Sequence, residues 1–95
     1  MDLIKQVLEF REKNKLKIET KPQLMDIFSL VEKQCELQKH IDEIQRSWMK
    51  KDMDGLSRAM SESIFAILSL GSEMGIHEDI KMNLYEKTAS RPNRT

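Results

Sequence analysis

The sequence predicts an all-α fold. Only three glycines and two prolines interrupt the 95 residues, and apolar residues recur every three or four positions, which is typical of amphipathic helices. The apolar and polar alternation that marks strands is absent. We therefore expect one four-helix domain over residues 1–90 and a basic tail at 91–95. A chain of this length buries a small core, so an oligomeric helical bundle is expected.

The first two predicted helices each carry an apolar face. The first runs from about Asp2 to Lys15 and has one stripe, made of Leu3, Ile4, Val7, Leu8 and Phe10. Pro22 suits the first turn of the second helix, which continues to about Met49 and is the longest. Apolar residues cover more than half of the second helix, so we expect it to pack on more than one side.

Two shorter segments complete the predicted bundle. Asp54 is expected to cap a third helix, which ends where Gly75 can adopt a left-handed conformation. A fourth helix follows from Ile76 to about Lys87. The expected core face of the third helix consists of six apolar residues and one glycine at helical spacing, namely Leu56, Met60, Ile64, Ile67, Leu68, Gly71 and Met74.

The charge balance and the cysteine count limit the classes of function. Sixteen basic and sixteen acidic residues give no net charge, which disfavours nucleic acid as the main partner. Cys35 is the single cysteine, so no internal disulfide can form. No apolar stretch is long enough to span a membrane, and no signal peptide is recognisable. The sequence therefore predicts a cytoplasmic protein with no membrane segment.

Acidic residues follow one side of the second predicted helix. Glu32, Glu36, His40 and Glu43 lie three or four residues apart, so they form a stripe opposite the apolar face. One interpretation is a solvated polar face. The other is a groove formed with a second helix or subunit, where a cation neutralises the clustered carboxylates. A helical wheel of one chain does not separate these interpretations.

The third predicted helix adds a carboxylate and an aromatic ring on its polar side. Phe65 lies one turn after Glu62, on a side shared with Arg58, Ser69 and Glu73. In one interpretation Phe65 stacks on a nucleobase while Glu62 reaches a metal ion. In the other, Phe65 fills an oligomer interface.

The helix order and the two acidic segments together resemble the MazG-like nucleoside triphosphate pyrophosphohydrolases, over about residues 20–92. The segment Glu32-Lys33-Gln34-Cys35-Glu36 is followed by Leu37 in a long helix, and a second acidic motif runs into an apolar helix before Gly75-Ile76. The resemblance implies hydrolysis of a nucleoside triphosphate to the monophosphate and pyrophosphate. It also implies Mg²⁺ held by E-E-x-x-E and E-x-x-D motifs, and assembly as a homodimer or homotetramer.

The family's site residues carry over to four positions of this chain, and the helical pattern adds Phe65. Glu36 and Glu62 match metal ligands, and Glu32 matches a carboxylate that is free to act as the general base. Arg91 matches a terminal arginine that contacts phosphate, and Phe65 is the candidate for contact with the nucleotide base. The resemblance therefore predicts a Mg²⁺-dependent nucleotide site between the second and third helices.

Tyr85 and Ala89 stand where the family often has lysine and asparagine for phosphate contacts, and two departures in the acidic motifs each remove a metal ligand. Lys33 stands where the first motif has its middle glutamate, and an ammonium group repels Mg²⁺. Ala59 stands where the second motif begins with glutamate, and a methyl group is no ligand. The sequence therefore predicts a MazG-like nucleotide-binding protein whose hydrolysis is weakened or lost. The alternative is a non-catalytic helical module for protein interaction or regulation.

Overall fold

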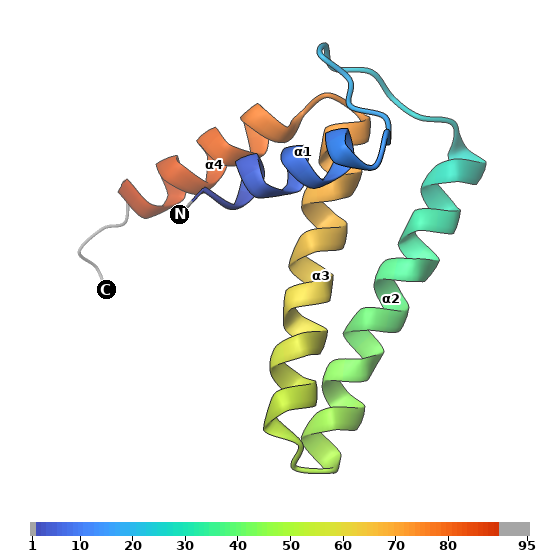
Figure 1. Cartoon of the computed structure of the whole chain (residues 1–95), viewed down its shortest axis with the longest axis vertical. Helices are drawn as coiled ribbons and strands as arrows, with labels where there is room; N and C mark the ends of the chain where they lie inside the picture. Colours follow the sequence, from blue (N-terminus) through green and yellow to red (C-terminus); the bar gives the residue numbers. More distant parts are fainter. Residues whose placement is uncertain (1, 90–95) are drawn as a thin grey trace.

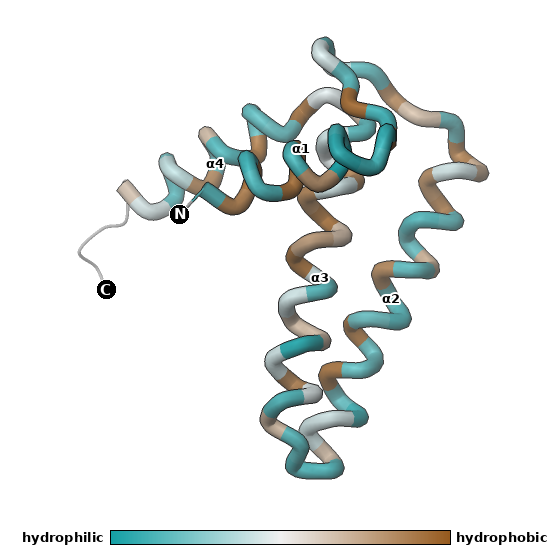
Figure 2. The backbone as a smooth tube through the Cα atoms, viewed as in Figure 1, coloured by the Kyte–Doolittle hydropathy of each residue, from teal (hydrophilic) through white to brown (hydrophobic). Residues whose placement is uncertain are grey.

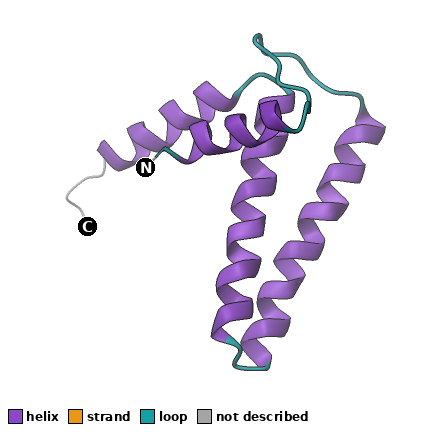
Figure 3. Ribbon diagram, in the orientation of Figure 1, coloured by secondary structure: helices purple, strands orange, loops and turns teal. Residues whose placement is uncertain are grey.

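Four α-helices form an L-shaped molecule, in which a long hairpin carries a shorter two-helix arm at one end (Figure 1). The structure is a computed structural model that describes residues 2–89. Its helices are α1 (Leu3–Lys13), α2 (Ile27–Met49), α3 (Met53–Glu73) and α4 (His77–Ala89). No strand occurs within the described part of the chain, so the all-α prediction is confirmed (Figure 3).

The hairpin of α2 and α3 depends on small side chains. Gly55, Ala59 and Ser63 recur every four residues of α3 and are all buried. A Cβ atom at Gly55 would lie 2.9 Å from the hydroxyl oxygen of Ser47 on α2, so this side of α3 faces α2 at close range. Short side chains therefore let the two helix backbones approach, and α2 is the longest helix, as predicted.

The two-helix arm supplies most of the apolar core. Ile4 and Val7 of α1 pack with Leu68 of α3, and three half-buried residues surround them, Leu8, Phe65 and Ile80. Gly71 leaves room for the Ile80 side chain of α4, because a Cβ at that position would collide with it. The core therefore lies at the junction of α1, α3 and α4.

The connection between α1 and α2 is tied to the end of α3. The backbone N–H of Glu19 donates to the Ser72 carbonyl at 3.0 Å, and that of Gln23 donates to the Met74 carbonyl at 2.9 Å. Gly75 has a φ of +71°, which confirms the predicted left-handed residue after α3. These bonds fix the loop across the top of the hairpin.

Two predicted helix starts are wrong. The second helix starts at Ile27 rather than near Pro22, because Asp26 caps it by accepting a hydrogen bond from the Ser29 backbone at 2.9 Å. The third helix is capped by Asp52 rather than Asp54, since the Asp52 carboxylate accepts from the Gly55 backbone at 3.0 Å. In both places a side chain that bonds three residues ahead decides where the helix begins.

The predicted core face of the third helix is wrong at three of its seven positions, whereas Leu68 and Gly71 are buried and Leu56 and Met74 are half-buried. Met60, Ile64 and Ile67 remain 47%, 49% and 45% exposed. The small residues of α3 contact α2 instead, and Leu68 turns toward α1. Hydrophobic positions thus continue along α3 beyond the part that α1 and α4 cover (Figure 2).

The molecule is open for its size. The chain exposes 7558 Å², whereas a compact protein of 11.2 kDa exposes about 5,700 Å². Its radius of gyration is 15.2 Å, against about 12 Å for a compact domain of this length. Among residues 2–89, no helix has the length and apolar character needed to cross a bilayer. The predicted tail at 91–95 lies outside the described residues.

Candidate functional site

Three predicted site carboxylates lie exposed on the hairpin. Glu32 and Glu36 belong to α2, and Glu62 belongs to α3. Lys33 of α2 contacts Glu73 of α3, so this contact marks one side of the antiparallel pair. By the helical period, Glu62 lies on the same face of α3 as Glu73, and Glu36 lies one turn beyond Lys33. The hairpin therefore presents Glu36 and Glu62 on one side, at levels about one to two helical turns apart.

The third carboxylate of the α2 stripe is already bonded within its own helix. Glu43 accepts a hydrogen bond from Arg46 at 2.8 Å. This bond, more than the nearby charges of Arg46 and Lys50, holds the pKa of Glu43 below its usual value. His40 lies half-buried one turn earlier. Glu43 is thus ionised but engaged, and Glu32 and Glu36 remain the open carboxylates of this stripe.

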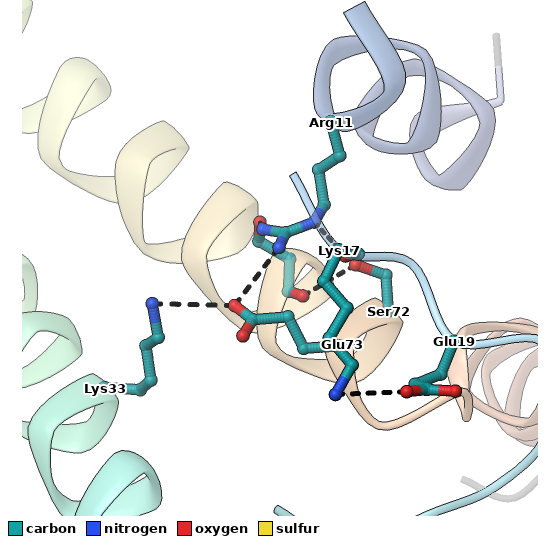
Figure 4. Close-up of polar contacts among 7 residues, drawn as sticks. Arg11, Lys17, Glu19, Lys33, Ser72 and Glu73 are labelled. Carbon is teal, nitrogen blue, oxygen red and sulfur yellow. Dashed lines mark hydrogen bonds and ion pairs between the residues drawn. The ribbon is translucent and has the colours of Figure 1, made fainter. Parts of the chain in front are cut away.

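Lys33, which replaces the middle glutamate of the family motif, bridges two helices. Its ammonium group lies 3.6 Å from the Glu73 carboxylate of α3, and the same carboxylate oxygen lies 3.3 Å from the Arg11 guanidinium of α1 (Figure 4). Glu73 therefore links α1, α2 and α3. Because the lysine charge is paired with Glu73, its repulsion of a cation near Glu36 is partly offset.

Arg11 is the buried charge of this linkage. It is 6% exposed, its Nε donates to the Lys17 carbonyl at 3.0 Å, and its Nη1 donates to the Ser69 hydroxyl. Arg11 is not among the site residues predicted from the sequence. The signal was present, because Arg11 follows Ile4 and Val7 at helical spacing and so continues the buried side of α1.

Ala59 lies where a site carboxylate has no room. It is 3% exposed and belongs to the run of small residues that contacts α2. A glutamate at this position would enter the interface between the two helices rather than the solvent. The resemblance predicts a glutamate at position 59, and the close packing of α2 against α3 accounts for the alanine that stands there.

Phe65 is half-buried and already has an aromatic partner. Its ring meets that of Phe10 edge to face, with centroids 5.0 Å apart and an angle of 86° between the ring planes. The aromatic residue on the polar side of α3 is thus explained by α1, which covers this part of the helix. Contact of the same ring with a nucleobase stays a prediction.

The metal prediction depends on few protein ligands. Within residues 2–89, no group of three or more His, Cys, Asp and Glu side chains is placed to hold a metal ion. Mg²⁺ often binds through one or two carboxylates and completes its octahedron with phosphates and water. Glu36 and Glu62 fit that use only together with a bound triphosphate. Arg91, the predicted phosphate contact, lies outside the described residues.

No protein-family model matches the chain, and no curated protein matches its sequence.

Proposed function

We propose that the chain is a MazG-like nucleotide-binding protein that works as a homo-oligomer and hydrolyses nucleoside triphosphates slowly or not at all. The observation that carries this proposal is the hairpin, which presents Glu36 and Glu62 on one side with both carboxylates open to solvent. This arrangement suits a Mg²⁺ ion that arrives with the phosphates of its nucleotide. The order of the helices adds support.

Each residue of the proposed site has a separate task. Mg²⁺ supplies neutralisation of the phosphate charge when it is bound. Glu36 and Glu62 would hold the ion, and Glu32 would orient or deprotonate the attacking water as a general base. Glu73 forms an ion pair with Lys33, and this pairing reduces the repulsion between the lysine charge and the Mg²⁺ ion. Ala59 contributes no ligand, so we infer weak hydrolysis or binding alone.

The first test is calorimetric titration of the full chain with a panel of ribo- and deoxyribonucleoside triphosphates, with and without Mg²⁺. Product analysis of the same mixtures then separates binding from turnover. We expect Mg²⁺-dependent binding, with little or no monophosphate and pyrophosphate. Fast turnover would show that hydrolysis is intact, and the absence of binding to every nucleotide would reject the proposal.

Matched variants locate the site. Glu36→Gln and Glu62→Gln each remove a charge without changing the size of the side chain, so each should weaken Mg²⁺-dependent binding at least about tenfold. Glu12→Gln makes the same change on α1, where Glu12 is exposed, and should leave binding unchanged. Equal affinities for all three variants would place the nucleotide elsewhere.

A second function is favoured by a different observation. Large hydrophobic side chains are exposed on every helix, including Phe28 at 84% and Trp48 at 70%. Contiguous apolar surface of this kind usually marks a protein interface. A non-catalytic helical interaction module is therefore the alternative, and it is preferred if no nucleotide binds.

A further inference from the structure

An exposed apolar stripe follows the length of α3. Met53, Met60, Ile64 and Ile67 are 72%, 47%, 49% and 45% exposed, and Leu56 is half-buried beside them. By the helical period these five residues lie within about 80° of one another. We call them the α3 seam. Within residues 2–89 no helix covers the α3 seam along its length, since α2 packs on the small residues of α3 and α4 lies beside only Ile64 and Ile67.

The spacing of the α3 seam is symmetric. The steps from Met53 to Ile67 are three, four, four and three residues, so the pattern reads the same in both directions from Met60. A second copy of α3 running antiparallel would place Met53 opposite Ile67 and Leu56 opposite Ile64. Met60 would then meet its own counterpart on the two-fold axis, as an isologous interface requires.

No charge obstructs this pairing. The charged residues of α3 between Met53 and Ile67 are Asp54, Arg58 and Glu62. By the helical period all three lie more than 90° from the centre of the α3 seam. The nearer flanks are occupied by Ser57 and the buried Ser63, each about 60° from the centre of the seam, and their small side chains permit close helix approach. Two copies can therefore bury the seam without burying an unpaired charge.

The shape of the protomer extends the contact beyond α3. A groove of about 880 Å³ lies in the inner corner of the L, where Ile67 of the seam meets Ile80, Leu84 and Tyr85 of α4. At the far end of the hairpin, Trp48 and Met49 are 70% and 66% exposed. Ser47 of α2 lies beside Gly55 of α3, so the antiparallel register brings Trp48 to about the level of Ala66 in the other copy. This level is next to Ile67 and Leu68, which line the groove.

We propose that a second copy of this chain occupies this surface, with the two α3 seams packed antiparallel about Met60 and each hairpin tip seated in the corner groove of the other copy. The surface area that the chain exposes is large enough for such an interface. The chain exposes about 1,900 Å² more than a compact protein of its mass. A standard interface needs about 800 Å² from each partner, and obligate homodimers use more.

This inference rests on the homo-oligomeric part of the proposed function and is independent of nucleotide binding. Glu62 lies on the side of α3 away from the seam, so the dimer leaves Glu36 and Glu62 open. Loss of nucleotide binding with an intact dimer would therefore reject the proposed function alone. A change of dimer geometry would reject only the inference made here.

Sedimentation of the full chain tests the surface. The unmodified chain should sediment as a dimer, and Met60→Lys should weaken the dimer about a hundredfold or more, because two ammonium groups would meet on the axis. Phe28→Lys places the same charge on an exposed residue of α2 outside the surface and should leave the dimer intact. A monomer at all concentrations, or dissociation by Phe28→Lys but not by Met60→Lys, would overturn the proposal.

Cross-linking tests the register and does not depend on a disruptive variant. In a Cys35→Ser background, subunits with Met53→Cys are mixed with subunits carrying Ile67→Cys and treated with a short bismaleimide. The antiparallel register predicts a cross-linked pair in the mixture and none with either variant alone. A Met53→Cys subunit that cross-links with its own kind would indicate a parallel seam and overturn the register.

Discussion

Gly75 meets two requirements at once. Its φ of +71° ends α3 in the left-handed region, which costs other residues about 1–2 kcal/mol. A side chain there would also collide with the Lys21 carbonyl of the loop that crosses the hairpin. The residue therefore joins the end of a helix to a loop that is distant in sequence.

We predict that Gly75→Ala lowers the free energy of unfolding by more than about 1 kcal/mol. Urea unfolding followed by circular dichroism measures the loss. Gly75→Asn separates the two causes, since asparagine tolerates the left-handed region but still carries a Cβ. If the asparagine variant loses as much as the alanine variant, the collision with Lys21 dominates; a loss of stability in neither variant would contradict both causes.

Glu73 compensates a buried cation. Its partner Arg11 has a side chain only 7% exposed, whereas the Lys33 side chain is 39% exposed. Glu73→Gln should thus cost about 3 kcal/mol, because it leaves the Arg11 charge buried without a counterion. Lys33→Met removes only the more exposed ion pair, that of Lys33 with Glu73, and should cost less than about 1 kcal/mol. Thermal unfolding of both variants measures the difference, and equal losses would mean that Arg11 does not need the carboxylate.

At the scale of elements, two helix starts depend on ionised caps. The backbone N–H of Ser29 lowers the pKa of Asp26, and its hydroxyl adds to the shift. The backbone N–H of Lys5, and then the Lys81 side chain, lower the pKa of Asp2. Because both pKa values are lower in the folded state, their stabilisation is present above about pH 4 and is lost as pH falls through the folded values.

We predict that Asp26→Ala destabilises the protein at pH 6 and that its difference from the unmodified chain narrows below about pH 4. Unfolding in urea across this pH range measures the difference. Asp26→Asn is the control, since it keeps a capping oxygen without a titrating charge. It should lose less at pH 6, and a difference that stays constant with pH would contradict the role of the carboxylate.

The α2–α3 contact predicts the effect of a glutamate at position 59. Ala59→Glu would place a carboxylate between the two helices, at a position 3% exposed. We expect a loss of several kcal/mol or failure to fold, because the charge would be buried without a partner. Ser61→Glu makes a similar change at an exposed position and should cost little. Circular dichroism compares the two, and a stable Ala59→Glu variant would mean that the hairpin can open at this level.

The helices themselves could be predicted from the sequence, but the surfaces against which their apolar faces pack could not. Periodicity indicates that Met60 and Ile64 share an apolar face, but it cannot tell whether that face meets another helix of the same chain or another protein. Ala59 and Ser63 gave a weak apolar signal, yet both are buried on the side of α3 that faces α2. Similarly, the Lys33 contact with Glu73 joins residues 40 positions apart, and local spacing carries no information about such a pair.

For the whole molecule, the balance between core and surface predicts that stability depends on concentration. Only four hydrophobic residues of the described chain are buried, Ile4, Val7, Ala59 and Leu68, which is little for a domain of this length. If two copies cover each other's α3 seam, folding is coupled to association and the unfolding midpoint rises with protein concentration. A domain of this size should gain about 4 °C in its unfolding midpoint for each tenfold increase in protein concentration.

Differential scanning calorimetry over two decades of concentration measures this rise. Met60→Lys, which separates the copies, should show a lower midpoint that does not change with concentration. A constant midpoint for the unmodified chain would mean that one protomer is stable with its apolar stripe exposed.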